Sequence, residues 1–231
     1  MVEAERAKLE VDERGDGVVV TLASGDAGNY LGLEELDALA SRFRSAEDSG
    51  KRWVLLRQHG RDFCLGRAPA PGPTGEERRA ALIDFVQLMQ KIEVVTVAAA
   101  DGGCAGFGVG LFALADISIA ADGAWFQFPE ILNGPAPAIV ASWLYDRVPY
   151  KQALYWTMTG EKFGSADAYQ FGLASRITSA SALQSVAQQT IETLDSLSGK
   201  AIRNCKSAAR VMSSTPPDLA VRRALALKWF L

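Results

Sequence analysis

The sequence predicts an α/β fold with crossover connections that ends in a helical region. Strand and helix patterns alternate along most of the chain, and helical patterns alone fill its last part, which is the order expected when parallel strands are joined by helices. The chain has 231 residues, 48% of them hydrophobic and 22% charged. This length and composition are ordinary for one globular domain with a sizeable core.

Strands are predicted where short β-branched or apolar runs lie between turn residues. These runs cover residues 18–22, 53–56, 94–99 and 117–120, with a last short strand at 174–178. Helices are predicted where apolar residues recur at helical spacing. These segments are residues 33–43, 76–91, 111–115, 138–147, 151–157, 166–171, 182–197, 201–212 and 219–229. Residues 57–75 and 101–110 are rich in glycine or proline and are interpreted as loops.

Composition excludes several classes of function. The net charge of −3 and the pI near 5.3 argue against nucleic acid or an anionic membrane as the main partner, since both need a basic face. The N-terminus has no signal-peptide pattern, and no apolar run reaches the ~20 residues that span a bilayer. Cys64, Cys104 and Cys205 are odd in number and widely spaced, so we expect no disulfide, no metal site and a reduced, cytoplasmic compartment, with each thiol as a packing residue.

Two glycine-rich turns each follow a predicted strand. They cover residues 62–69 and 101–110, and the second leads into a helix. Glycine lets the backbone approach a ligand closely, and a helix N-terminus offers unpaired N–H groups, so such a turn suits a phosphate or a developing oxyanion. The glycines at 106, 108 and 110 alternate, which is not the dinucleotide-binding pattern, and no Gly-Lys-Ser/Thr phosphate loop is present.

A third feature is a carboxylate among aromatic and apolar residues. Glu130 lies in the segment 125–131, which contains Trp125, Phe126, Phe128 and Ile131. Apolar surroundings raise the pKa of a carboxyl group, as a general acid/base near neutral pH requires. From composition alone, a solvated loop glutamate is an equal alternative.

Some other residues invite a catalytic interpretation. His59, the only histidine, lies at a predicted strand end and is expected to be structural or exposed. No serine stands in a nucleophile-elbow context, and the five tryptophans are expected to serve packing. Arg57, Arg61 and Arg67 form either a solvated rim or counter-charges for ligand phosphates.

Together and in this order, these features resemble the crotonase superfamily, the enoyl-CoA hydratase/isomerase family. The resemblance covers residues 9–209 and rests on segments 26–31, 63–68, 106–117, 128–137 and 159–174. It implies a crotonase-like spiral of ββα units over residues 1–175 and a C-terminal helical trimerisation region over 176–231, which is incomplete beside the family. It also implies a homotrimer or a dimer of trimers.

The resemblance implies an acyl-CoA thioester as substrate and no cofactor beyond its coenzyme A. The thioester oxygen would lie between the backbone N–H groups of Arg67 and Phe107, and Glu130 would be the general acid/base. The expected substrate-contacting residues are Ala27, Cys64, Gly66, Ala68, Gly103, Gly106, Pro129, Gly134 and Pro137. A large Phe107 is expected to shape the acyl pocket.

The sequence departs from the family at one catalytic position. Many hydratases of the family hold a water between two glutamates, and Gly110 stands where the first of these is expected. One carboxylate can shuttle a proton between two carbons or, less efficiently, activate water, so the sequence indicates an enoyl-CoA isomerase or hydratase. We therefore expect Gly110→Glu to raise hydration. Another enolate reaction, such as decarboxylation or C–C cleavage, and a non-catalytic acyl-CoA-binding paralogue remain open.

Overall fold

A six-stranded, mostly parallel sheet forms the centre of the molecule. The computed structural model of the chain describes residues 7–24, 28–68 and 75–213. The strand order is β1-β2-β3-β4-β6-β9, with β1 antiparallel to β2 and every other pair parallel. The strands are β1 (Leu9–Arg14), β2 (Gly17–Ala23), β3 (Trp53–His59), β4 (Val95–Ala100), β6 (Ile117–Ala121) and β9 (Arg176–Thr178). Parallel neighbours need crossover connections, which the helices supply.

A second, three-stranded sheet lies beside the first. It consists of β5 (Gly103–Ala105), β7 (Trp125–Gln127) and β8 (Phe163–Gly164), in the order β5-β7-β8. Strands β5 and β7 are parallel, and Ala105 is paired with Gln127. This small sheet therefore joins the second glycine-rich turn to the segment that leads to Glu130.

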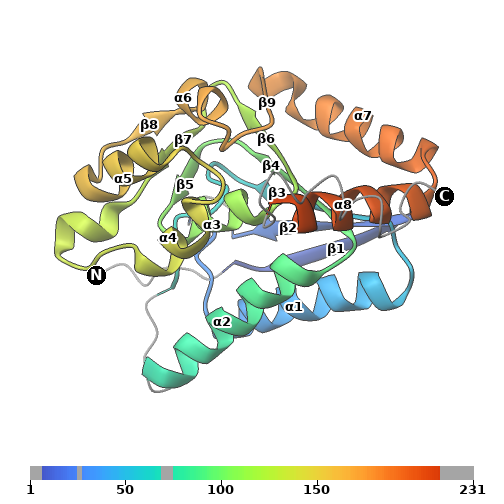
Figure 1. Cartoon of the computed structure of the whole chain (residues 1–231), viewed down its shortest axis with the longest axis horizontal. Helices are drawn as coiled ribbons and strands as arrows, with labels where there is room; N and C mark the ends of the chain where they lie inside the picture. The colour runs from blue at the N-terminus through green and yellow to red at the C-terminus, as the bar shows by residue number, and fades with distance from the viewer. Residues whose placement is uncertain (1–6, 25–27, 69–74, 214–231) are drawn as a thin grey trace.

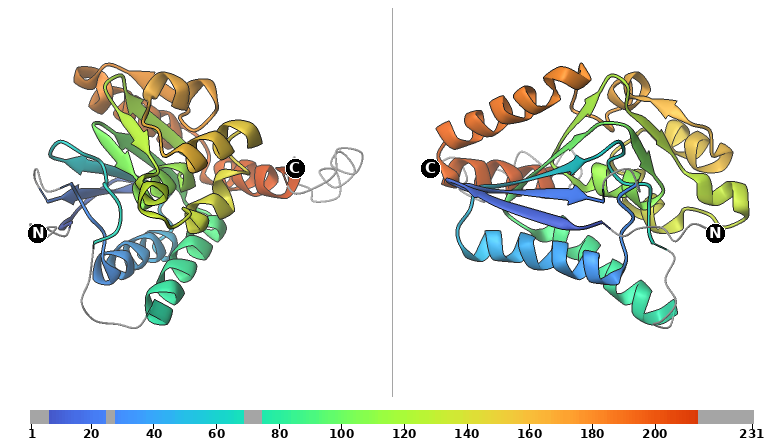
Figure 2. Two further views of the ribbon diagram at one scale, coloured as in Figure 1. Left: turned by 90° about the vertical axis from the view of Figure 1, so that its left-hand side faces the viewer. Right: turned by 180° about the vertical axis from the view of Figure 1, so that it is seen from behind.

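Helices cover both faces of the large sheet. They are α1 (Leu33–Asp48), α2 (Gly75–Lys91), α3 (Phe107–Leu114), α4 (Ala138–Leu144), α5 (Tyr150–Thr159), α6 (Ser165–Gln170), α7 (Leu183–Ser196) and α8 (Gly199–Ser213). Two 3-10 helices are η2 (Pro129–Asn133) and η3 (Ala180–Ala182). Helices α1 and α2 lie on one side of the sheet and α7 on the other, while α5 and α6 gather around the small sheet (Figures 1 and 2).

The alternation of side chains along the strands produces two cores, because successive residues point to opposite faces. On one face, Val20, Leu56 and Ala98 belong to the large core that also contains α1, α2 and α3. On the other face, Leu55 and Val97 belong to a smaller core with residues of α7 and α8. Both faces of the parallel sheet are therefore buried, as such sheets require.

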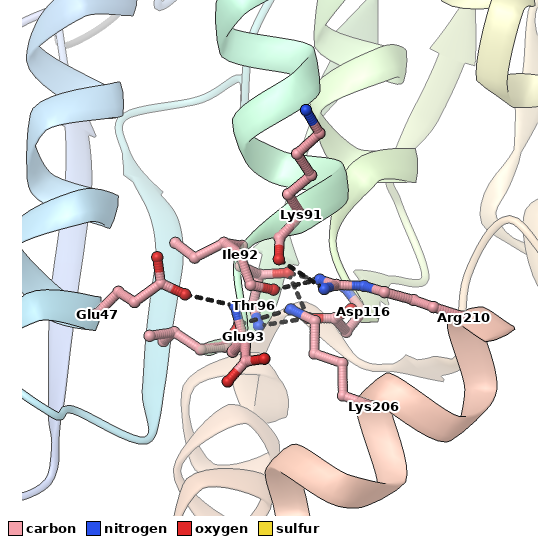
Figure 3. A network of polar contacts seen from close by, with 9 residues as sticks. Glu47, Lys91, Ile92, Glu93, Thr96, Asp116, Lys206 and Arg210 are labelled. Atoms are coloured by element: carbon pink, nitrogen blue, oxygen red, sulfur yellow. Dashed lines mark hydrogen bonds and ion pairs between the residues drawn. The ribbon is translucent and has the colours of Figure 1, made fainter. Parts of the chain in front are cut away.

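A polar network holds α8 against the start of β4 (Figure 3). The Lys206 Nζ donates to the Val94 carbonyl and to the Asp116 carboxylate, both at 2.6 Å. That carboxylate also accepts from the backbone N–H and hydroxyl of Thr96, at 2.7 and 2.8 Å. Burial lowers the pKa of the Lys206 amine, and the Asp116 partner offsets part of this effect. Arg210 adds hydrogen bonds to the carbonyls of Lys91 and Ile92.

The predicted α/β class is confirmed, and the predicted strands are present with shifts of a few residues at their ends. The prediction for residues 101–110 is wrong in detail, because β5 begins at Gly103 and α3 begins at Phe107 instead of residue 111. Strands β1, β7 and β8 were not predicted. The predicted helix at 219–229 lies outside the described residues. The division into 1–175 and 176–231 stays a prediction.

Two smaller expectations have different outcomes. Cys64 and Cys104 are fully buried, but Cys205 is exposed on α8, so a packing role is wrong for Cys205. Within the described ranges, no helix combines the length and apolar character needed to cross a membrane.

Candidate active site

The two glycine-rich turns lie side by side through backbone hydrogen bonds. Cys64 donates its N–H to the Gly103 carbonyl at 3.1 Å and accepts from the Ala105 N–H at 2.9 Å, forming a parallel bridge between Cys64 and Cys104. Segments 63–68 and 103–107, distant in sequence, are therefore held side by side and run in the same direction at this bridge.

Two backbone amides at the ends of these segments are available to a ligand. Leu31 donates to the Gly66 carbonyl and accepts from the Ala68 N–H, which leaves the Arg67 N–H between them without a hydrogen bond to another described residue. Phe107 is the first residue of α3, where backbone N–H groups have no partner inside the helix. Its N–H likewise makes no hydrogen bond within the described part of the chain.

Glycine is required where α3 approaches its surroundings. Gly106 has φ +52°, and a Cβ there would lie 2.4 Å from the Glu130 Oε1. A Cβ at Gly108 would lie 1.9 Å from the Cys64 carbonyl oxygen. The start of α3 therefore touches both the first glycine-rich turn and the Glu130 carboxylate, which brings three predicted features to one place.

The Glu130 carboxyl group is half-buried on η2, and one of its oxygens has no hydrogen-bond partner in the part of the chain that the structure describes. Oε2 is buried and makes no hydrogen bond to a described residue. Desolvation raises the pKa of Glu130, while its own backbone N–H and the charge of Arg67 lower it in part. A raised pKa moves a carboxyl group toward the range in which a general acid/base works, and the unused oxygen is available to a proton. The buried interpretation of Glu130 is therefore favoured over a solvated loop glutamate.

The position of the missing first glutamate is filled. A Cβ at Gly110 would lie 2.7 Å from the Trp143 Cζ2 and 2.9 Å from the Val140 Cγ2. Trp143 is buried, and its indole N–H donates to the Gly110 carbonyl at 3.2 Å. The indole ring of α4 thus occupies the space into which a side chain at residue 110 would extend.

A buried polar scaffold behind the first turn was missed by sequence reasoning. The Asp62 carboxylate, 2% exposed, accepts the Gly103 N–H at 2.8 Å, and the Asp62 carbonyl accepts from the Asn29 side chain at 2.8 Å. Asn29 is fully buried with φ +49°, and it accepts from the N–H and hydroxyl of Ser24. The signal in the sequence was the aspartate that begins the first glycine-rich turn.

The other expected substrate-contacting residues differ in exposure and in the elements that carry them. Cys64, Gly66, Gly103 and Gly106 are buried, Ala68 is half-buried, Pro129 begins η2, Gly134 follows it, and Pro137 precedes α4. Ala27 lies outside the described residues. The buried Phe107 ring packs on Phe85, with ring centroids 6.2 Å apart. Whether these residues touch a substrate stays a prediction.

The three arginines near the first glycine-rich turn have different partners. Arg57 donates to the Thr21 hydroxyl and the Gln184 side chain, and Arg61 pairs with Asp62. Arg67 alone of the three influences the Glu130 carboxyl group. His59 is exposed at the end of β3, as expected. The residues that the structure describes include no group of three or more His, Cys, Asp or Glu side chains that could hold a metal ion.

Comparison with known proteins identifies the family of the chain. The family model described as enoyl-CoA hydratase/isomerase matches residues 13–228. A protein named probable enoyl-CoA hydratase EchA8 from Mycobacterium tuberculosis is 35% identical over 197 residues, which cover 82% of this chain and 76% of that protein. A 4-chlorobenzoyl coenzyme A dehalogenase of Arthrobacter is 28% identical over 169 residues, and the match spans 69% of this chain but only 60% of the dehalogenase.

Solved structures agree with the sequence matches. The crystal structure of an enoyl-CoA hydratase from Mycobacterium smegmatis has a TM-score of 0.88 and 25% identity, covering 94% of this chain and 88% of that one. An enoyl-CoA hydratase subunit from Geobacillus kaustophilus has a TM-score of 0.87 at 22% identity, covering 98% and 91%, and supports the fold alone. The chain therefore belongs to the enoyl-CoA hydratase/isomerase family, the crotonase superfamily.

Proposed function

We propose that this protein moves a proton on an acyl-CoA thioester through an enolate, with Glu130 as the single acid/base. The observation that carries the proposal is the buried Glu130 Oε2, which has no hydrogen-bond partner among the described residues. Its carboxyl group lies against Gly106, the residue before Phe107, whose N–H makes no hydrogen bond to a described residue. Buried polar atoms without partners are rare in native proteins and call for an explanation. A substrate C–H that gives up its proton to this oxygen supplies one.

The reaction that best fits one carboxylate is isomerisation of a 3-enoyl-CoA to a 2-enoyl-CoA. Glu130 as carboxylate takes a proton from C2, and the electron pair of that bond moves into the thioester carbonyl. The N–H groups of Arg67 and Phe107 donate hydrogen bonds to the resulting oxyanion, and the loss of one such donor typically costs ~3 kcal/mol of transition-state stabilisation. The Glu130 acid then returns the proton to C4, so no atom is gained or lost.

The filled space at Gly110 supports isomerisation over hydration. A hydratase with two carboxylates holds its water between them, and here Trp143 and Val140 occupy the side-chain space of residue 110. Hydration by Glu130 alone is the second form of the proposal. Decarboxylation or C–C cleavage of an acyl-CoA would use the same two amides and would not need a second acid.

The experiment is incubation of a panel of 2- and 3-enoyl-CoA thioesters with the protein in D2O, followed by mass spectrometry. Deuterium uptake with a shifted double bond and no added water supports the isomerase, and addition of one water identifies a hydratase. We expect Glu130→Gln to abolish turnover and to leave acyl-CoA affinity within a few-fold. Unchanged turnover in that variant would remove Glu130 from the mechanism, and tight acyl-CoA binding without any turnover would identify a binding paralogue.

A further inference from the structure

We propose that Gln127 is a positioning residue that fixes the Glu130 carboxyl group beside the Phe107 N–H by fastening η2 to helix α5. The inference rests on the proposed function of Glu130. Gln127 is the last residue of β7 and stands three residues before Glu130. It contacts two other segments at once, one through its backbone and one through its side chain.

The backbone contact links Gln127 to the second glycine-rich turn. The Gln127 carbonyl accepts the Gly106 N–H at 2.9 Å, and Gln127 is paired with Ala105 of β5. The residue after Gly106 is Phe107, whose N–H is one of the two proposed oxyanion donors. The strand that leads to the acid/base is therefore in register with the strand that leads to the donor.

The side-chain contact links Gln127 to the end of α5. Its Nε2 donates to the Gly160 carbonyl at 2.9 Å. Gly160 ends α5 in the left-handed conformation, with φ +63°, and a Cβ there would lie 2.8 Å from the Ile131 Cγ2 and 2.9 Å from the Leu132 Cγ. Gly160 therefore contacts the chain on both sides of Glu130. Before Glu130 it accepts the Gln127 amide N–H, and after Glu130 it lies against the apolar side chains of Ile131 and Leu132.

This arrangement explains how a short 3-10 turn keeps a carboxyl group in place. None of the five residues of η2 is fully buried, so core packing of the turn itself contributes little. Glu130 depends on its neighbours, because a displacement of about 1 Å in a catalytic group can cost ~100-fold in rate. Without the amide donor at residue 127, the strand end before η2 is no longer bound to α5, and only the apolar contact at Gly160 remains.

The test compares variants of Gln127 that remove only the N–H donor. Gln127→Leu and Gln127→Glu have similar size and lack an amide donor at neutral pH, and Gln170→Leu, at an exposed position of α6, is the matched control. We expect kcat for the reaction found with the thioester panel to fall about 10- to 100-fold in both Gln127 variants. We expect KM to change less than about threefold, because acyl-CoA binding does not depend on the Glu130 position.

A second readout needs no turnover and separates positioning from a merely structural role. The pKa of Glu130 is measured by NMR of carboxyl-labelled glutamate, with Glu130→Gln used to assign the signal. Because burial raises the pKa of Glu130 in the wild type, release of η2 should expose the carboxyl group and lower this pKa in Gln127→Leu. The added carboxylate of Gln127→Glu acts in the opposite direction, so this readout uses the uncharged variant. Gln127→Met, which keeps the length of the side chain, replaces Gln127→Leu if the latter does not fold.

The outcomes distinguish this inference from the proposed function. An unchanged Glu130 pKa in folded Gln127→Leu, together with an unchanged kcat in both Gln127 variants, would overturn the role of Gln127 while Glu130 remains the acid/base. An active Glu130→Gln would overturn the proposed function, whatever Gln127→Leu does to the pKa. A lower Glu130 pKa in Gln127→Leu but not in Gln170→Leu supports the positioning role even if no thioester in the panel reacts.

Discussion

Replacing Gly110 by alanine tests whether the space beside α3 is already filled. The added Cβ would lie 2.7 Å from the Trp143 Cζ2 and 2.9 Å from the Val140 Cγ2, closer than real Cβ contacts, and both neighbours are buried. Overpacking of this kind costs about 1–3 kcal/mol, and the better helix propensity of alanine returns at most ~1 kcal/mol. We therefore expect Gly110→Ala to lower the free energy of unfolding by about 1–2 kcal/mol.

The assay is urea denaturation of the variant beside a matched control. Gly123 lies in a turn with no atom within 4 Å of a Cβ at that position, so Gly123→Ala should change stability by less than about 0.5 kcal/mol. In a Trp143→Phe background the cost of Gly110→Ala should shrink, because the two residues share one space. Equal stability of Gly110→Ala and Gly123→Ala would refute the filled-space argument.

The filled space beside residue 110 also changes the outcome that we expect for glutamate at this position. Gly110→Glu adds a carboxylate to apolar, occupied space, which costs several kcal/mol out of a typical total of about 5–15. We now expect this variant to be unfolded or marginally stable and to gain no hydratase activity. A folded Gly110→Glu protein with increased hydration would contradict the role assigned to Trp143 and restore the expectation from sequence.

Two further predictions concern charged groups. Lys206→Met removes both the ion pair with Asp116 and the hydrogen bond to Val94. We expect the free energy of unfolding, measured by urea denaturation, to fall by ~2 kcal/mol. Lys200→Met, on the exposed side of α8, is the neutral control. Because the pKa of Glu130 is raised by folding, the folded state keeps a proton that the unfolded state has lost, and wild-type stability falls as pH rises above the ordinary carboxyl pKa. Glu130→Gln should therefore be more stable than the wild type at pH 7, with the difference vanishing below about pH 3, and an equal difference at both pH values would contradict a raised pKa.

Much of the fold could be predicted because its strongest signals are local. The buried strand β4 reads as a continuous apolar run, and α7 has apolar residues at helical spacing, so both are visible in the sequence. The short strands β5 and β8, of three and two residues, carry no such pattern, since pairing across the fold alone makes them strands. The early start of α3 was hidden because glycines read as turn residues, although Gly108 is needed there for close packing.

The residues of the candidate site were likewise predictable only in part. Glu130 and the two glycine-rich turns could be predicted because clustered glycines, and a carboxylate among aromatic residues, are visible in the sequence itself. Asp62, Asn29 and Gln127 act through partners 33 to 41 residues away, and an aspartate or an amide side chain in a loop does not show which distant N–H or carbonyl it will meet. The partner of Gly110 was hidden for the same reason, because Trp143 reaches it from another helix.

The burial of two thiols has a practical consequence for measuring motion in the unmodified protein. Burial raises the pKa of Cys64 to about 12 and the pKa of Cys104 well above its ordinary value, whereas Cys205 is exposed. Because alkylating reagents attack the thiolate, they should modify one thiol quickly in each native chain and the other two only after local opening. Cys64 and Cys104 are paired in the bridge between the two glycine-rich turns. Their slow alkylation therefore times how often these segments separate, and a tightly bound acyl-CoA should lengthen that interval.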